Sequence, residues 1–130
     1  MKSSKVGVTA VSPQFVVEDL VRTAEHYRDI LGFEIRGYFL DPPAHAIVGR
    51  GRAEIFLAKA SGRSGISNRE LKAGAIDAYF HVEGLDALFE ELKDRDAGII
   101  EGPVIRVYGT REIVVHDCDG FVLVFGEDAG

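Results

Sequence analysis

Residues 15–20 read Phe15-Val16-Val17-Glu18-Asp19-Leu20, and residues 80–85 read Phe80-His81-Val82-Glu83-Gly84-Leu85. The pattern Phe-x-Val-Glu-x-Leu therefore occurs twice, 65 residues apart. Strand-like residues precede each copy, and an amphipathic helix that stops near a glycine follows it. This arrangement predicts a duplicated β-strand and α-helix unit.

The residues after each copy complete the unit in the same way. Asp19 is a suitable N-cap for a helix that carries one apolar stripe and ends at Gly32, and a second helix runs from Leu85 to a stop at Gly98. Three strands follow each helix. The expected strands are 6–17, 33–39, 44–48 and 53–59 in the first unit, and 75–82, 104–108, 113–116 and 121–125 in the second.

The expected fold is α+β, with two tandem βαβββ units whose helices lie outside a half-closed, cup-shaped mixed sheet. The first unit spans about 8–59 and the second about 76–127, in a single domain of residues 1–130. Residues 60–75 are rich in Ser, Gly and charge and form the predicted linker. Residues 49–52, with two glycines, read as a tight hairpin turn.

Composition narrows the functional class. The formal net charge of −6 argues against nucleic acid as a partner, because phosphate binding requires clustered Lys and Arg. The first residues are polar and no long apolar run follows, so we expect neither a signal peptide nor a membrane span. The one cysteine, Cys118, cannot form an internal disulfide, which favours a cytoplasmic location.

Four landmarks carry a resemblance to a known superfamily. They are residues 13–19, Arg28-Asp29-Ile30-Leu31-Gly32-Phe33, Gly84-Leu85-Asp86-Ala87-Leu88 and Asp117-Cys118-Asp119-Gly120-Phe121. In order and spacing the chain resembles the vicinal-oxygen-chelate superfamily from about residue 8 to 127. That superfamily contains glyoxalase I, extradiol dioxygenases, fosfomycin-resistance enzymes and bleomycin-resistance proteins.

The resemblance implies four positions at which the metalloenzymes of the superfamily hold a divalent ion. They fall on Ser12, Glu54, Asp77 and Val124. Serine is a poor ligand and valine cannot be one, so we predict no metal. The alternative is a lyase, isomerase or dioxygenase that holds Zn, Ni, Mn or Fe through Glu54, Asp77 and either His81 or His116.

The stretch Tyr108-Gly109-Thr110-Arg111-Glu112 resembles the bleomycin-resistance type most, although Tyr108 stands where Trp is common and Cys118 where Pro is usual. This resemblance implies a homodimer that binds a small organic, antibiotic-like molecule without metal, in crevices between subunits. Sequestration of such a compound is the predicted function.

The repeat also predicts which side chains line the cup. An offset of 65 pairs Ser12 with Asp77, Gln14 with Tyr79 and Val16 with His81. Aromatic residues could stack on a planar ligand or simply pack within the sheet, and His81 could instead make one hydrogen bond to a neighbouring strand. The predicted ligand-binding residues are Ser12, Gln14, Tyr38, Glu54, Phe56, Asp77, Tyr79, His81, Tyr108, His116 and Val124.

Overall fold

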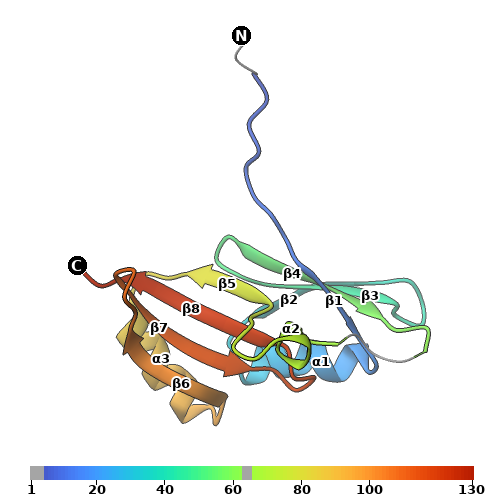
Figure 1. The fold of residues 1–130 in the computed structure, drawn as a ribbon. Helices are drawn as coiled ribbons and strands as arrows, with labels where there is room; N and C mark the ends of the chain where they lie inside the picture. The colour runs from blue at the N-terminus through green and yellow to red at the C-terminus, as the bar shows by residue number, and fades with distance from the viewer. Residues whose placement is uncertain (1–4, 63–65) are drawn as a thin grey trace.

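A computed structural model describes residues 5–62 and 66–130. Two four-stranded sheets lie side by side, and the two long helices cover one face of them (Figure 1). The sheets do not close into a barrel.

The first sheet belongs to the first unit. Its strand order is β1-β4-β3-β2, in which β1 runs parallel to β4 and the other neighbours are antiparallel. The elements are β1 (Gln14–Val17), α1 (Leu20–Asp29), β2 (Glu34–Phe39), β3 (His45–Arg50) and β4 (Ala53–Lys59).

The second sheet repeats this plan with the order β5-β8-β7-β6, and β5 is again parallel to β8. A short helix in the linker, α2 (Asn68–Leu71), was not predicted. The other elements are β5 (Ala78–His81), α3 (Leu85–Asp94), β6 (Gly98–Ile105), β7 (Thr110–His116) and β8 (Val122–Asp128). The two βαβββ units predicted from the repeat are thus confirmed.

Local signals explain where α1 begins and ends. The Asp19 carboxylate accepts a hydrogen bond from the backbone N–H of Arg22 at 3.1 Å, as an N-cap does. Gly32 has a φ of +75°, which only glycine adopts without strain, and it lets the chain turn into β2.

The main hydrophobic core lies between the helices and the sheets, and both units contribute to it. Phe15 of β1 stacks on Phe121 with ring centroids 4.4 Å apart. Phe33 meets Phe80 of β5 edge to face at 5.8 Å. Aromatic contacts therefore join the two sheets, whose edge strands β1 and β5 share no ladder hydrogen bonds.

Some predicted boundaries differ from the structure. The first strand begins at Gln14 instead of Val6, and residues 5–13 form an extended arm that projects from the body (Figure 1), where Val8 is 92% exposed. Helix α3 ends at Asp94, and Asp96, with a φ of +62°, reverses the chain. Gly98 therefore begins β6, which starts six residues earlier than the expected 104–108 strand.

Each sheet has an open face, directed away from α1 and α3. In the first sheet Phe15 and Val17 point into the core, so Gln14 and Val16 lie on the open face. In the second sheet Tyr79 pairs with Val124, which pairs with Val114, and these side chains share the open face. The expected single cup is thus divided into two open faces within one chain.

Candidate functional site

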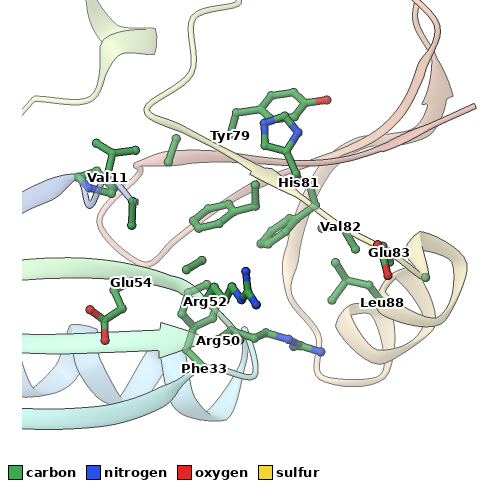
Figure 2. Close-up of a pocket in the computed structure, with 18 of the residues that line it drawn as sticks. Val11, Phe33, Arg50, Arg52, Glu54, Tyr79, His81, Val82, Glu83 and Leu88 are labelled. Carbon is green, nitrogen blue, oxygen red and sulfur yellow. The ribbon is translucent and has the colours of Figure 1, made fainter. Parts of the chain in front are cut away.

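A cavity of about 870 Å³ lies between the two units (Figure 2). It is bounded by the base of the N-terminal arm, the β3–β4 turn, β5 and the start of α3. This volume lies in the range of about 300–1,000 Å³ that is usual for small-molecule sites. We refer to it as the inter-unit cavity.

Aromatic and aliphatic side chains of the core form the apolar lining of the cavity. Phe80 stacks on Phe125 with ring centroids 5.0 Å apart, and Phe33 packs edge-on against Phe80. Leu88 of α3 adds an aliphatic surface beside them. Because core packing fixes these rings, the apolar surface is already formed without a ligand.

An ion pair between the units closes one side of the cavity. Arg50, at the end of β3, donates from Nη1 to Oε2 of Glu91 on α3 at 2.5 Å and from Nη2 to Oε1 at 3.1 Å. Arg50 Nη1 also donates to the backbone oxygen of Leu31 at 3.2 Å. The hydrogen bonds from Arg50 hold the pKa of Glu91 below its ordinary value. A Cβ at Gly32 would meet this guanidinium, so glycine at that position also makes room for the ion pair.

Arg52, in the β3–β4 turn, also lines the cavity but has no such partner. Within residues 5–62 and 66–130, its side chain makes no hydrogen bond or ion pair. Its neighbour Glu54 accepts a hydrogen bond from Arg36 Nη1 at 3.0 Å. Figure 2 shows the side chains of Arg50 and Arg52 extending from the turn toward Val82 and Leu88.

The predicted ligand-binding residues divide among several places. Four of the eleven line the inter-unit cavity: Glu54, Asp77, Tyr79 and His81. Gln14 and Phe56 line a second hollow of about 310 Å³ on the open face of the first sheet. The residues Ser12, Tyr38, Tyr108, His116 and Val124 are in the lining of neither cavity.

The strand register explains the position of Tyr38. It pairs with Ala46, which is buried in the main core, so its side chain points to the helix side of the first sheet. The charged groups that act electrostatically on its hydroxyl, Glu25 and Arg28, are on α1. Tyr38 and Phe56 therefore lie on opposite faces of the first sheet.

Asp77 has a structural task. Its Oδ1 accepts a hydrogen bond from the backbone N–H of Asn68 at 2.8 Å, and its Oδ2 accepts one from the N–H of Val122 at 2.8 Å. The carboxylate thereby fastens α2 and the linker to the start of β5 and β8. Neither oxygen is left without a hydrogen bond.

The four positions implied for a metal do not suit a divalent ion. Gln14 pairs with Phe56 and its repeat counterpart Tyr79 pairs with Val124, so Val124 corresponds to Phe56 and not to Glu54. Val124 is also buried against its apolar neighbours. No three His, Cys, Asp or Glu side chains of the described residues are grouped closely enough to hold a metal.

Glu112 of β7 is a buried carboxylate that sequence reasoning did not single out as a site residue. Its Oε2 accepts hydrogen bonds from the hydroxyls of Tyr79 at 2.8 Å, Tyr108 at 2.8 Å and Thr110 at 2.9 Å, and its Oε1 accepts one from Arg106 Nε at 3.0 Å. Burial acts to raise the pKa of Glu112, but these donors outweigh it and hold the pKa below its ordinary value. The only sequence signal was the Arg-Glu pair that follows Tyr108-Gly109-Thr110.

Gly126 makes the Tyr79 contact possible. The Tyr79 ring crosses β8 at this glycine, where a Cβ would lie 2.5 Å from Cζ of the ring. Tyr79 also lies beside His81, with ring centroids 5.0 Å apart. Tyr79 and the buried Glu112 thus form a hydrogen-bonded pair on the open face of the second sheet.

His116 and the β7–β8 turn lie outside the cavity lining, and the turn contacts the first unit. The His116 ring lies over Gly98, and its Nδ1 is 3.0 Å from the backbone oxygen of Asp117. Thr23 of α1 donates to Asp119 at 2.6 Å, and burial raises the pKa of the neighbouring Cys118 thiol to about 11. This cysteine is therefore a weak nucleophile at neutral pH.

The family now follows from comparison. The model of the Glyoxalase/Bleomycin resistance protein/Dioxygenase superfamily matches residues 8–125, so the chain belongs to this superfamily. This agrees with the paired βαβββ units and confirms the resemblance to vicinal-oxygen-chelate proteins.

Solved structures share the fold at low sequence identity. TioX from Micromonospora sp. ML1 is 17% identical, with a TM-score of 0.73, over 93% of this chain and 99% of TioX. A putative glyoxalase family protein from Bacillus anthracis is 18% identical, with a TM-score of 0.73, over 98% and 99%. UcmS2 is 22% identical, with a TM-score of 0.71, over 96% and 100%.

A search of curated proteins gives no match to this sequence. Among the helices of residues 5–62 and 66–130, none is both long and apolar enough to cross a membrane.

Proposed function

We propose that this protein binds a small organic molecule in the inter-unit cavity without a metal ion, and that it sequesters an antibiotic-like compound in this way. The single observation that carries the proposal is the cavity of about 870 Å³ with its stacked phenylalanine lining. Membership of a superfamily that includes bleomycin resistance proteins supports the ligand class. Binding would bury the apolar part of the ligand against Phe33, Phe80 and Leu88.

Calorimetric titration and native mass spectrometry of the purified protein test this proposal. We expect a copurified or added aromatic compound to bind at one site per chain. The Ala87→Trp variant should not bind it, because Ala87 lines the cavity from the exposed side of α3 and the larger side chain would fill the site. Glu90→Trp, also exposed on α3 but outside the lining, should bind normally. If Ala87→Trp binds as well as the parent protein, the ligand is not in the cavity.

Metal analysis tests the metal-independent part separately. The parent protein should contain less than one divalent ion per ten chains after purification, and EDTA should leave ligand affinity unchanged. A stoichiometric ion whose removal abolishes binding would favour the alternative of a metal-dependent lyase, isomerase or dioxygenase.

We also propose a homodimer, in which a second copy covers the open faces. Val16, Phe39 and Phe56 each expose more than a third of their surface on the open face of the first sheet or at its end. Exposed apolar surface of this kind is typical of protein interfaces. The N-terminal arm, whose valines are exposed, offers further apolar surface.

Light scattering at micromolar concentration should give roughly twice 14.2 kDa. Phe56→Lys should shift the protein toward the monomer, whereas Val21→Lys on the exposed side of α1 should not. A monomeric parent protein would contradict this assembly.

The remaining proposals concern organisation and location. We propose that residues 1–130 fold as one domain, supported by the aromatic contacts between units, so fluorescence and circular dichroism should report one coincident unfolding transition.

We further propose that the protein acts in the cytoplasm as a protein without nucleic-acid or membrane partners, as its acidic charge and single cysteine suggest.

A further inference from the structure

We infer that the ligand of the inter-unit cavity is an organic anion with an apolar or aromatic body, and that Arg52 binds its carboxylate, sulfonate or phosphate group. This inference rests on the proposed function, since it assumes that the cavity is the binding site. It adds the charge of the ligand and the residue that recognises it.

The charged groups that line the cavity are mostly compensated already. Arg50 and Glu91 neutralise one another through two hydrogen bonds. Glu54 is neutralised by Arg36, which lies outside the lining. Any of these groups would have to give up an existing partner in order to bind a ligand.

The lining contains two other carboxylates, those of Asp77 and Glu83. Asp77 accepts hydrogen bonds from two backbone N–H groups. Glu83 is exposed to solvent, and the first backbone N–H groups of α3, those of Gly84 and Leu85, donate to Glu127. A cationic ligand at Asp77 would have to compete with its two backbone donors.

Arg52 is the guanidinium in the lining that has no counter-charge within the described residues. It occupies the tight β3–β4 turn after Gly51, whose φ of +59° fixes the direction of the chain. The ion pair of Arg50 with Glu91 holds the adjoining end of β3 against the second unit. Arg52 therefore extends from a fixed backbone into the region between the turn and α3 (Figure 2).

The chemistry of guanidinium selects the ligand group. Arginine presents its donors in a planar fork that matches the two oxygens of a carboxylate, sulfonate or phosphate. Phe33, Phe80 and Phe125 line the same cavity and offer apolar surface for the rest of the ligand. An apolar body can lie on the rings while the anionic group meets Arg52.

Two matched fluorescent probes test this inference. 1-Anilinonaphthalene-8-sulfonate carries an aromatic body and a sulfonate, and N-phenyl-1-naphthylamine has the same body without charge. We expect the parent protein to bind the sulfonate at least roughly tenfold more tightly than the neutral probe. Arg52→Gln should remove this preference by weakening sulfonate binding roughly tenfold and leaving the neutral probe unchanged.

Arg22→Gln is the matched control, because Arg22 is exposed on α1 and its side chain makes no hydrogen bond or ion pair in the described part of the chain. It should bind both probes as the parent does. Ala87→Trp should block both probes, which places them in the cavity. Raising the salt concentration should weaken sulfonate binding in the parent protein but not in Arg52→Gln.

The outcomes separate the two proposals. If both probes bind the cavity equally and Arg52→Gln changes neither affinity, the anion inference is overturned while the proposed function stands. If neither probe binds, or Ala87→Trp leaves both bound, the cavity is not the site and both proposals fail.

Discussion

Tyr27→Phe removes a single hydroxyl from a buried hydrogen bond that joins the two units. Tyr27 of α1 is fully buried, and its hydroxyl donates to Oδ2 of Asp117, before the β7–β8 turn, at 2.5 Å. Asp117 is 1% exposed, and its Oδ1 accepts from the backbone N–H groups of Asp119 and Phe121, each at 2.9 Å. Phenylalanine fills the same space, so the variant should fold.

The expected loss of stability in Tyr27→Phe follows from the charge and burial of the hydrogen-bond acceptor, Asp117. A hydrogen bond to a charged group contributes about 1.5–3 kcal/mol, and Asp117 would lose one of its three donors while staying buried. We therefore expect the free energy of unfolding at pH 7 to fall by about 2 kcal/mol.

The loss of stability in Tyr27→Phe should also depend on pH. Burial raises the pKa of Asp117, and the Tyr27 hydrogen bond opposes that rise, so the substitution raises the folded-state pKa further. A carboxyl whose folded pKa exceeds its unfolded value destabilises the fold only while it is ionised. The loss should thus be complete near pH 7 and shrink as the pH falls toward the ordinary Asp value of about 4.

Urea unfolding followed by circular dichroism, at equal protein concentrations, measures these changes. Tyr38→Phe is the matched control, since Tyr38 is 38% exposed and its hydroxyl makes no hydrogen bond among the described residues. It should cost less than about 0.5 kcal/mol. If Tyr27→Phe costs no more than Tyr38→Phe at pH 7, this reasoning is refuted.

Three further predictions concern Asp77, Gly126 and His26. Asp77→Ala should lower the free energy of unfolding by about 2 kcal/mol, because two backbone N–H groups lose their acceptor. The control Asp128→Ala, at the exposed end of β8, should lower it by under about 0.5 kcal/mol. Equal losses would show that the two hydrogen bonds of Asp77 do not stabilise the fold. Gly126→Ala should displace the Tyr79 ring and cost about 1–3 kcal/mol, and an unchanged NMR spectrum of that ring would disprove the crossing. Burial lowers the pKa of His26, so the folded state binds fewer protons than the unfolded chain. Stability should therefore rise as the pH approaches about 6.5 and level off above it, and His26→Gln should flatten this rise.

The fold could be predicted because its signals are local and occur twice. The N-cap at Asp19 and the turn at Gly32 depend on neighbouring residues alone, and both are confirmed. The beginning of the first strand could not be predicted in this way. Residues 6–13 have strand-like composition, but in the register of Gln14 with Phe56, β4 begins at Ala53 and reaches back only as far as residue 11. Pro13, which has no backbone N–H, also interrupts a ladder at this point.

The candidate site was harder to predict because its residues are identified only by tertiary packing. Phe33 and Phe80 look like ordinary core residues in the sequence, and residues 49–52 look like a simple hairpin turn. The cavity appears only when the second unit packs against that turn. The register of β5 against β8 also depends on three-dimensional pairing, so the sequence alone could not show that Val124 corresponds to Phe56.

The core shared by the two units has a consequence for the history of the chain. Phe15 and Phe33 in the first unit are covered by Phe121 and Phe80 of the second. A single βαβββ unit, before any duplication, would expose these rings to water and would have to associate with another copy of itself to bury them. Fusion of two such genes would then have turned an association between separate molecules into a permanent contact and freed the two halves to diverge.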